Sequence, residues 1–337
     1  MADPHASPVA AGTGAQPADT SPAQAAPAEA RRTPTLMLLN PRAGGGRARK
    51  LLREIEASVA LARPRPMFFM TDDVRGARKL VDAMPAGSRV IVAGGDGSVQ
   101  QLLPSLVAGG HTLALVPIGS GNDTARALGV AGKNWRKALD IALHAPASAI
   151  DIGEISFTEA GGRSERRALF ISSLAAGFDA SVTARAAGIP GWLTGLPRYL
   201  LATLAELAML RRFSIELRTD GETRHQGEVL LASSLNTPTY GAGMPVAPPA
   251  EDSDGKLDLM LAEGMGLLRA LRLLPAMLAG RHLGQRGISH LRFADLEARA
   301  STPLPIAADG EYLGEVSALR VLIRPGLLSV VRRPDAC

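Results

Sequence analysis

Three polar, glycine-rich stretches interrupt the first half of the chain, and each directly follows an apolar run. They are Asn40–Gly46 (NPRAGGG), Gly94–Ser98 (GGDGS) and Pro117–Asp123 (PIGSGND). Glycine lets a backbone approach a ligand closely, and the free N–H groups at a helix start attract an anion. One such stretch is equally typical of an ordinary strand-to-helix turn. Three that end strands of one sheet instead predict a cradle of N–H groups for a polyphosphate.

Carboxylates gather in two later stretches. Ala308–Glu311 (ADGE) offers Asp309 and Glu311 after an apolar run, and a hydroxyl nucleophile needs such a base within hydrogen-bond reach. The residues by themselves favour a simpler interpretation, because Asp-Gly between two β-like runs is typical of a hairpin turn. The second stretch, Glu251–Leu259 (EDSDGKLDL), holds four acids and by its spacing is a solvated acidic turn.

Several other kinds of site are excluded. No stretch matches the P-loop pattern, and the G-x-G that begins at Gly119 fails the dinucleotide pattern because Thr124 stands at its sixth position. The single cysteine, Cys337, permits neither an intrachain disulfide nor a cysteine-ligated metal cluster. The six histidines are scattered and form no H-E-x-x-H pair. A phosphate group would therefore have to be held by the glycine stretches.

The elements that must position these stretches alternate along the first part of the chain. Buried strands are predicted within residues 35–40, 65–71, 90–93 and 111–117, and a glycine turn or helical pattern follows each of them. Strands that alternate with helices predict a parallel, doubly wound sheet in an α/β domain. Such sheets bind ligands beyond the carboxyl ends of their strands, where the three glycine stretches lie.

The pattern changes near residue 149, where short β-like runs begin. These runs occupy residues 149–157, 167–180, 212–220, 227–236, 256–264, 290–300 and 318–331. Two helical stretches, Trp192–Leu210 and Gly266–Ala279, interrupt them. We therefore predict an α/β domain at 34–147 and a mainly antiparallel, β-sandwich-like domain at 148–337. Whether the last segment returns to the first domain is left open.

The remaining composition bounds the partners. Residues 1–33 are predicted to form a disordered tail rather than a secretory signal. The longest apolar stretch, 191–213, is interrupted by Arg198 and Glu206; it is either an amphipathic helix on a membrane or pocket, or an ordinary half-buried helix. The net charge of +5 favours anionic partners. An aromatic content of 4% argues against base-stacking nucleic-acid modules.

The order of the motifs resembles the diacylglycerol kinase catalytic family, which includes sphingosine and ceramide kinases and the soluble bacterial lipid kinases. NPRAGGG resembles its opening motif, GGDGS and PIGSGND its paired motifs, and DGKLDL and ADGE its two later ones. The resemblance covers about Leu36 to Val331. NAD kinases share GGDG, so PIGSGND and the full order carry the resemblance. Departures are mild: Ser98 and Ser120 replace the family's usual threonines, and Gln100-Gln101 its usual Asn-Glu.

The resemblance implies an ATP-dependent lipid kinase with the nucleotide between its two domains. The residues implied to position the phosphates and nucleoside are Asn40, Gly44, Gly45, Gly46, Thr71, Gly94, Gly95, Asp96, Gly97, Ser98, Ser120, Gly121 and Asn122. Asp96 is also implied to act in catalysis by holding Mg²⁺ beside the γ-phosphate. Its alternative role is a helix cap. The resemblance further makes Asp309 or Glu311 the catalytic base, without separating the two.

The resemblance also implies a structural Mg²⁺ site formed by Asp254 and the carbonyls of Leu257 and Leu259. The second domain would hold the lipid tails in an apolar cleft. Diacylglycerol is the default substrate, while a phosphatidylglycerol-like lipid and a sphingoid base stay open. The alternatives are an NAD kinase-like enzyme, or a non-catalytic, nucleotide-gated membrane-binding protein. We expect a cytoplasmic protein in peripheral contact with the inner membrane surface, without a nucleic-acid partner, and leave open a homodimer.

Overall fold

The computed structural model describes residues 33–130, 132, 134–162, 164–190, 193 and 195–333. The predicted disordered tail falls outside this range for residues 1–32, so it stays a prediction. Trp192 and Cys337 also lie outside the described residues.

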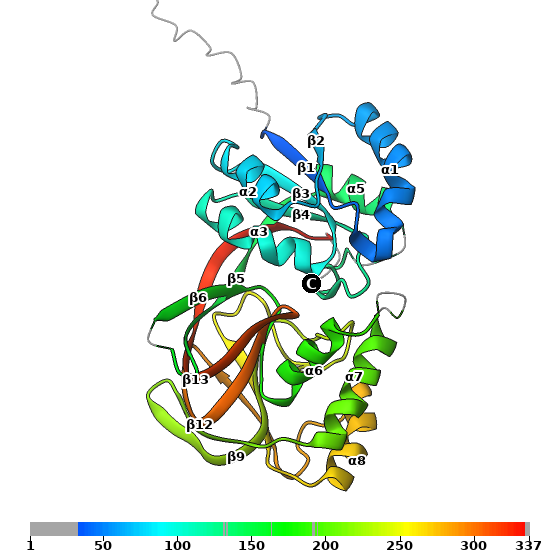
Figure 1. Ribbon diagram of the computed structural model, residues 1–337. Coiled ribbons are helices and arrows are strands. Elements are labelled where there is room, and N and C mark those ends of the chain that lie inside the picture. Colours follow the sequence, from blue (N-terminus) through cyan, green and yellow to red (C-terminus); the bar gives the residue numbers. More distant parts are fainter. Residues whose placement is uncertain are drawn as a thin grey trace, which may run out of the picture. The chain divides into compact units, whose positions relative to one another are not determined.

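The first lobe is built on a parallel sheet with the strand order β2-β1-β3-β4. Its strands are β1 (Thr35–Leu39), β2 (Met67–Met70), β3 (Arg89–Gly94) and β4 (Thr112–Pro117). The helices that follow them are α1 (Ala43–Leu61), α2 (Val74–Asp82), α3 (Asp96–Ala108), α4 (Asp123–Ala127) and α5 (Trp135–His144). Figure 1 shows α1 and α5 to one side of these strands and α2 and α3 to the other.

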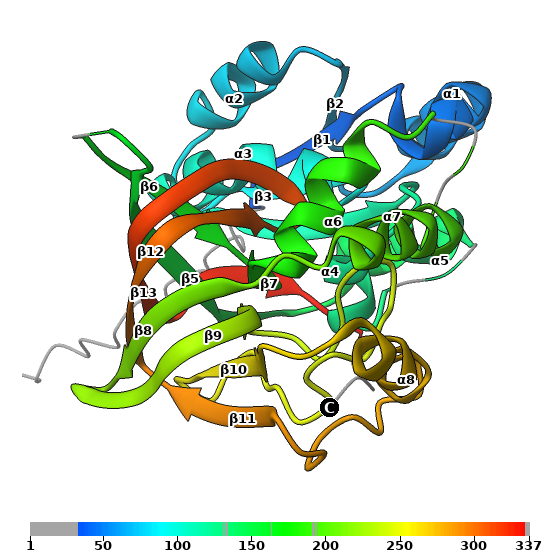
Figure 2. The ribbon, with the colours of Figure 1, turned by 60° about the horizontal axis from the view of Figure 1, so that its bottom comes forward.

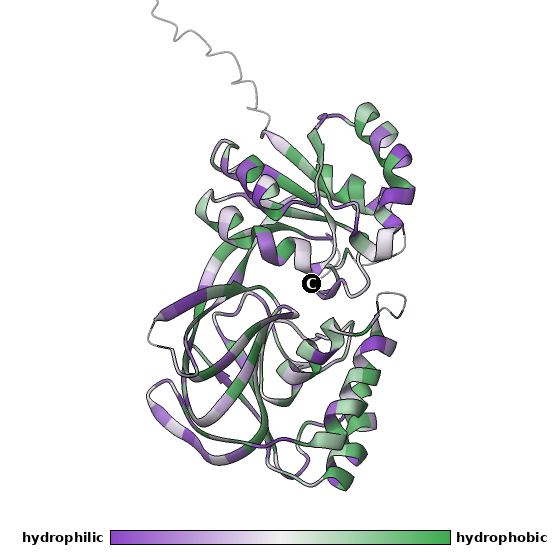
Figure 3. Ribbon diagram, viewed as in Figure 1, coloured by the Kyte–Doolittle hydropathy of each residue, from purple (hydrophilic) through white to green (hydrophobic). Residues whose placement is uncertain are grey.

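The alternation of side chains along each strand explains why helices cover both faces of this sheet. Leu36 and Leu38 of β1 belong to an apolar cluster that also contains residues of α2 and α3. Met37 and Leu39 belong to a second cluster, with residues of α1 and α5. Because both faces of β1, β3 and β4 are buried, these strands are continuous apolar runs, as parallel strands usually are. Three of the four residues of the edge strand β2 are exposed. Figure 3 shows these strands mostly in green, whereas α1 alternates between purple and green.

The second lobe is mainly antiparallel. Its strands are β5 (Ala147–Glu159), β6 (Glu165–Phe170), β7 (Ser173–Ala176), β8 (Phe213–Thr219), β9 (Glu222–Leu235), β10 (Leu257–Glu263), β11 (Ile288–Phe293), β12 (Asp295–Ala308) and β13 (Glu311–Val331). They pair in the order β11-β10-β9-β7-β12-β13, with β5, β6 and β8 attached beside this path. Their inward side chains, including Phe170, Phe213 and Phe293, form one apolar core. Figure 2 shows that the long strands of this lobe, such as β8, β12 and β13, are strongly curved.

Three helices accompany the strands of this lobe: α6 (Phe178–Ala187), α7 (Leu196–Met209) and α8 (Leu267–Leu278). Helices α7 and α8 contact each other. Leu207 of α7 and Leu273 of α8 share an apolar cluster with Leu231 of β9 and Met260 of β10. The two helices therefore cover the face of β9 and β10 that is turned away from the core of the strands. Pro197, which the sequence places near a helix start, lies in the first turn of α7.

Strand β13 belongs to both sheets. It begins in the hairpin with β12 and ends parallel to β4, with Ser329 opposite Thr112 and Val330 opposite Leu113. The last segment of the chain therefore returns to the first lobe, which the sequence left open. The predicted fold class, an α/β lobe with a parallel sheet followed by an antiparallel β lobe, is confirmed.

One predicted strand is wrong in part. The apolar run 167–180 was expected to be a single β-like run, but it divides into the end of β6, the short strand β7 and the start of α6. The break between β6 and β7 occurs because the N–H groups of Ile171, Ser172 and Ser173 donate to the carboxylate of Asp309 instead of to a strand. Gly177, at φ 99°, then turns the chain into the helix.

Candidate functional site

The three glycine turns meet at the carboxyl edge of the parallel sheet. The N–H of Asn40, after β1, donates to the carbonyl of Ala93 in β3 (3.0 Å). The N–H of Ile118, after β4, donates to the carbonyl of Gly94 (2.8 Å). In-register pairing of the strands thus brings together turns that are about 75 residues apart in the sequence.

Close approach of one turn to another accounts for several of the glycines. A Cβ at Gly119 would lie 2.5 Å from the Cα of Gly95, and one at Gly44 would lie 2.3 Å from the carbonyl oxygen of Ile118. Gly44, Gly45 and Gly46 all have positive φ, so the regular turns of α1 begin only after them. The glycines therefore serve the packing of turn against turn as well as any approach of backbone to ligand.

A polar cleft of about 1110 Å³ lies against these turns. Seven of the residues predicted from the sequence line it: Gly95, Asp96, Gly97, Ser120, Gly121, Asp309 and Glu311. The first five come from the parallel lobe and the last two from the hairpin formed by β12 and β13. The structure therefore brings the predicted phosphate turns and the predicted base candidates to one cavity.

Asp96 makes a contact that differs from its predicted structural alternative. Gly95, not Asp96, occupies the N-cap of α3. The carboxylate of Asp96 instead accepts the N–H groups of Asp123 and Thr124, each at 3.1 Å, at the start of α4. Asp96 thus ties the turn after β3 to the turn after β4, because it supplies the acceptor that the first turn of α4 lacks.

Asp123, the last residue of PIGSGND, also lines the cleft, although the sequence analysis did not single it out. Its carboxylate accepts hydrogen bonds from Arg126 (2.5 Å) and from the N–H of Ala242 (2.8 Å). Burial raises its pKa, and the charge of Asp96 acts in the same direction. The negative charges of the neighbouring Asp96 and Asp123 are only partly balanced by Arg126, so this end of the cleft attracts a cation. Its place beside Asn122 at the end of the PIGSGND motif is the sequence feature that could have marked Asp123 as a site residue.

The predicted base candidates lie at the two-residue hairpin turn between β12 and β13: Asp309 is in the turn, and Glu311 is the first residue of β13. Ala308 pairs with Glu311, and Asp309 and Gly310 between them have φ of 45° and 81°, the geometry of a type I′ turn. The carboxylate of Asp309 accepts N–H groups from Ile171 (2.7 Å), Ser172 (2.8 Å) and Ser173 (3.0 Å). The ADGE stretch therefore forms the hairpin turn that its Asp-Gly pair predicts and also supplies carboxylates to the cleft.

Asp309 and Glu311 differ in how their carboxylates are held. Burial raises the pKa of Asp309 to about 6, against the effect of its three backbone hydrogen bonds. The charge of Asp96, which lines the same cleft, also raises it. Glu311 is exposed, and its carboxylate makes no hydrogen bond within the described chain.

A smaller cavity of about 370 Å³ adjoins the carboxyl ends of β1 and β2. Asn40, Thr71 and Ser98, all predicted to contact the nucleotide, line it. The amide of Asn40 donates to the hydroxyl of Ser98 (2.9 Å), which fixes the two side chains together. The other predicted nucleotide residues lie in the same turns but line neither cavity: Gly44, Gly45, Gly46, Gly94 and Asn122.

Comparison with known proteins agrees with this architecture. Residues 34–155 match the diacylglycerol kinase catalytic domain, and residues 172–332 match the YegS C-terminal NAD kinase beta sandwich-like domain. A diacylglycerol kinase of Mycobacterium tuberculosis is 32% identical over 301 residues, which are 88% of this chain and 94% of that protein. The chain belongs to the diacylglycerol kinase family. It is a lipid kinase.

Further relatives and solved structures are similar to the kinase. A Pseudomonas fluorescens protein named "Probable lipid kinase YegS-like" is 34% identical over 269 residues, 77% of this chain and 83% of that protein. A solved diacylglycerol kinase from Bacillus anthracis has a TM-score of 0.70 at 21% identity, covering 90% of this chain and 98% of that one. An NAD kinase from Archaeoglobus fulgidus, solved with ATP, has a TM-score of 0.50 at 11% identity, covering 90% and 95%. These two likenesses show the fold alone.

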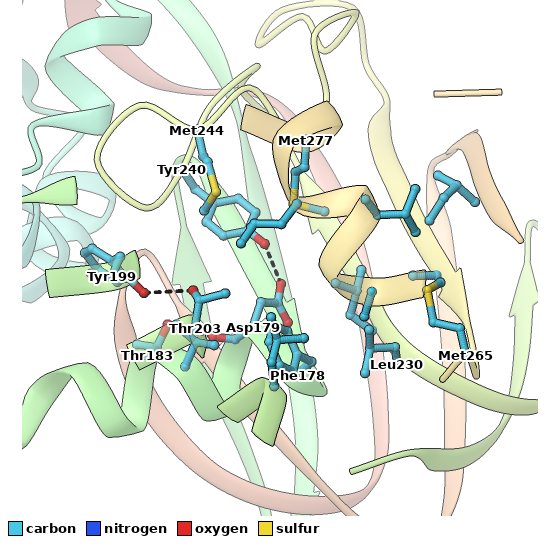
Figure 4. Close-up of a pocket in the computed structure, with 18 residues that line it drawn as sticks. Phe178, Asp179, Thr183, Tyr199, Thr203, Leu230, Tyr240, Met244, Met265 and Met277 are labelled. Carbon is cyan, nitrogen blue, oxygen red and sulfur yellow. Dashed lines mark hydrogen bonds between the residues drawn. The ribbon is translucent and has the colours of Figure 1, made fainter. Parts of the chain in front are cut away.

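An apolar cavity of about 730 Å³ adjoins the polar cleft of the kinase. Thr183, Tyr199 and Tyr240 line both cavities, so the two meet at these side chains. The other walls are mostly leucine, methionine and phenylalanine from α6, α7, α8, β9 and β10 (Figure 4). The sequence predicted an apolar cleft in this lobe, but no short motif marked these residues.

One carboxylate is buried in the wall of the apolar cavity. Asp179 accepts hydrogen bonds from the hydroxyls of Ser233 (2.5 Å) and Tyr240 (2.9 Å) and from the N–H of Ala180 (3.0 Å). Figure 4 shows the bond to Tyr240. Burial raises the pKa of Asp179 to about 6, although the hydroxyls of Ser233 and Tyr240 oppose this shift. Asp179 therefore anchors Tyr240 where the two cavities meet.

The structure places the acidic turn away from both cavities. Asp254 forms an ion pair with Arg292 and accepts the N–H of Lys256, while Leu257 and Leu259 lie inside β10 with fully buried side chains. Within the described ranges no group of three or more His, Cys, Asp or Glu side chains is arranged to hold a metal ion. The predicted Mg²⁺ site at Asp254, Leu257 and Leu259 stays a prediction.

No helix of the described residues is long and apolar enough to cross a membrane.

Proposed function

We propose that this kinase transfers the γ-phosphate of ATP to a hydroxyl of diacylglycerol. The observation that supports it most is the junction of two unlike cavities. A polar cleft with carboxylates and glycine turns meets an apolar cavity at Thr183, Tyr199 and Tyr240. A lipid alcohol has the same division, with one polar end and apolar chains. Its hydroxyl would lie in the cleft and a chain in the apolar cavity.

The nucleotide would occupy the cavities at the glycine turns. The N–H groups of these turns and Ser120 suit the phosphates, while Asn40 and Thr71 suit the nucleoside end. Arg198 also lines the cleft and adds a positive charge near the phosphates. Phosphoryl transfer depends on positioning and charge neutralisation, which such a rigid set of turns supplies.

Mg²⁺ fits the carboxylates at this end of the cleft. Asp96 and Asp123 both line it, and burial together with the charge of Asp96 raises the pKa of Asp123, a cost that a cation would relieve. Mg²⁺ bound to substrate phosphates commonly takes one or two carboxylates and keeps several waters. When bound, the ion would neutralise charge on the phosphates. Asp96 and Asp123 are therefore the proposed ligands.

Exchanging Asp96 for Asn tests this role. Asn keeps one acceptor for the two N–H groups of α4, so we expect a loss of stability of about 1 kcal/mol and a fall in turnover of a hundredfold or more, on the order seen when charge stabilisation is removed. Steady-state kinetics over a range of Mg²⁺ concentrations, beside thermal unfolding, would measure both. Near-normal turnover would leave Asp96 with its structural contact only.

Glu311 is the proposed base. A base must have a free lone pair to take the proton of the lipid hydroxyl as that oxygen bonds to the γ-phosphorus and ADP leaves. The carboxylate of Asp309 already accepts three N–H groups, whereas that of Glu311 is unengaged within the described chain. Asp309 would then fix the turn that aims Glu311 into the cleft.

Diacylglycerol is proposed as the substrate because relatives that match 88% and 67% of this chain are named diacylglycerol kinases. A phosphatidylglycerol-like lipid and a sphingoid base are the competing lipids. The NAD kinase alternative has support from the fold alone, and the non-catalytic alternative predicts ATP binding without turnover. A cytoplasmic location with access to the inner membrane surface belongs to the same proposal.

The deciding experiment incubates the purified protein with labelled ATP and Mg²⁺ in separate reactions with diacylglycerol micelles, a sphingoid base, phosphatidylglycerol and NAD. We expect labelled phosphatidic acid as the main product. Faster labelling of another lipid would change the substrate but not the reaction. Labelling of NAD above every lipid, or ATP binding with no labelled product at all, would contradict the proposal.

A further inference from the structure

Helix α7 turns its charged side chains toward the protein and exposes apolar ones, which is the reverse of an ordinary surface helix. Its two charged side chains, Arg198 and Glu206, point inward: Glu206 is 8% exposed and pairs with Arg185, while Arg198 donates to the carbonyl of Ala186 (2.6 Å). The residues exposed at helical spacing are apolar: Pro197, Leu201, Leu204 and Ala208. Surface helices of soluble proteins normally expose charges and bury such a stripe.

Helix α8 is apolar on two sides. Its inner side chains, Ala270, Leu273, Leu274 and Met277, line the apolar cavity. Its outward stripe has the same helical spacing and is exposed: Leu268, Leu271, Pro275 and Leu278. Leu268 is 71% exposed. A helix that is apolar on both sides is expected to have an apolar partner on each of them.

The exposed apolar side chains of the described chain concentrate on these helices. Eight of the fourteen large ones belong to α7 and α8: Leu196, Leu201, Leu204, Met209, Leu267, Leu268, Leu271 and Leu278. A concentration of this kind marks an interaction surface rather than scattered surface leucines.

The chain segment that contains α8 is basic, although Arg292 in it pairs with Asp254 and the exposed Glu263 ends β10 just before the helix. Between Glu263 and Asp295 the sequence contains no acid and five arginines: Arg269, Arg272, Arg281, Arg286 and Arg292. Arg272, Arg281 and Arg286 are exposed. Leucines flanked by arginines match a surface that has apolar chains below and phosphate groups above, which is the chemistry of an anionic phospholipid bilayer.

We propose that the outward stripes of α7 and α8 dock the protein onto an anionic phospholipid bilayer. Leu201, Leu204, Leu268 and Leu271 enter the acyl boundary, and Arg272 and Arg281 lie among the head groups. The same two helices wall the apolar cavity, so a lipid chain passes from the bilayer into the protein without crossing water. This last step rests on the proposed function, whereas the docking itself does not.

Vesicle sedimentation of the full chain, without ATP, tests the docking. The vesicles contain phosphatidylcholine alone or with phosphatidylglycerol. The variants are Leu201→Gln with Leu204→Gln on α7, and Leu268→Gln with Leu271→Gln on α8. We expect each pair to weaken binding by about tenfold or more. The matched control pairs Leu61→Gln with Leu327→Gln, two exposed leucines outside these helices, and is expected to bind like the wild type.

A second pair, Arg272→Gln with Arg281→Gln, tests the charge. It is expected to weaken binding to vesicles that contain phosphatidylglycerol, with little effect on neutral vesicles, and added salt should mimic it. Kinase activity on a short-chain diacylglycerol in micelles is expected to stay within about twofold of the wild type for all variants, since the substituted side chains point away from the cleft.

Two results would overturn the docking proposal. The first is vesicle binding that is as tight in the helix variants as in the wild type, or absent from the wild type. The second is a wild-type dimer that the helix variants convert to monomers while vesicle binding does not change, because the surface would then join two copies of this chain. Failure to phosphorylate any lipid would contradict the proposed function instead, and the ATP-free vesicle result would stand separately.

Discussion

At the scale of single residues, the carboxylates of the cleft differ in whether they accept hydrogen bonds from backbone N–H groups. Asp96 and Asp309 each accept backbone N–H groups from a turn far away in the sequence, so each has a structural contact as well as a place in the cleft. Glu311 has the place in the cleft without such a contact. We propose that this difference, rather than the residue type, makes Glu311 the base and Asp309 the residue that positions it.

Replacing each of the two carboxylates at the β12–β13 hairpin by its amide tests these roles. Glu311→Gln is expected to lower turnover by about 10²–10⁴-fold, with a change in stability within about 0.5 kcal/mol because the residue is exposed. Asp309→Asn is expected to lower both turnover and stability, because one amide oxygen cannot serve three N–H groups. Turnover and denaturant midpoints of both variants would be measured. A stable, inactive Asp309→Asn beside an active Glu311→Gln would reverse the assignment.

The pH dependence of stability should reveal Asp179. Its pKa rises from 3.8 to about 6 on folding, so the folded state holds more protons than the unfolded state between these values. The free energy of unfolding therefore falls as pH rises through this window and becomes independent of this group above it. Asp309, shifted in the same direction, adds to the slope.

Denaturant midpoints at several pH values between 4 and 7 would measure this slope. Asp179→Asn should reduce it whatever its effect on overall stability, and Asp309→Asn should remove a further part. An unchanged slope in Asp179→Asn would show that the group titrates alike in both states.

At the scale of elements, the site depends on turns that pack against one another. The turns after β1, β3 and β4 are in contact through glycines, and the turn between β12 and β13 is held by the break between β6 and β7. Each turn is short: those after β1, β3 and β4 lead from a strand into a helix, and the last joins two strands. The cleft is therefore set by backbone geometry before any ligand binds, which suits a reaction that depends on positioning.

Gly119→Ala tests the packing of these turns. The new Cβ would lie 2.5 Å from the Cα of Gly95, and since both atoms belong to backbone, neither can move aside cheaply. We expect a loss of about 1–3 kcal/mol and weaker ATP binding, measured by chemical unfolding and by calorimetry. Gly266→Ala is the control, because its Cβ would meet nothing within 4 Å. Equal stability of the two variants would contradict the close packing.

At the scale of the whole molecule, β13 joins the lobes. Its first half pairs with β12 and β5 in the antiparallel lobe, and its last residues pair with β4 of the parallel sheet. Leu328 and Val330 near its end are buried in the apolar cluster of the parallel sheet. Because the two sheets share a strand, we expect the described lobes to unfold together.

Leu328→Ala tests this coupling. Leu328 is 1% exposed, so its truncation should cost about 2–5 kcal/mol. The unfolding transition should shift as a whole, by circular dichroism and by tryptophan fluorescence alike. Leu327→Ala, at a neighbouring position that is 39% exposed, should change stability by no more than about 0.5 kcal/mol. Two separated transitions in the Leu328 variant would mean that the lobes unfold independently.

The sequence by itself determined what depends on neighbouring residues. Apolar runs that end in glycine turns identified β1, β3 and β4, and since parallel strands end at one edge, the motifs were expected to converge there. Seven of the predicted residues do line the cleft. The order of the motifs also identified the family, because each is a short contiguous string.

Only the tertiary structure decided what depends on contacts across long distances in the chain. Asp309 is held by residues 136 to 138 positions away, Tyr240 by Asp179, and Asp123 by a backbone group 119 positions away. The run 167–180 looked like one strand because an apolar pattern does not show which N–H groups a distant carboxylate will take. The direction in which α7 and α8 present their leucines was likewise undecided, because a leucine-rich helix has a buried side only once the lobe it covers is in place.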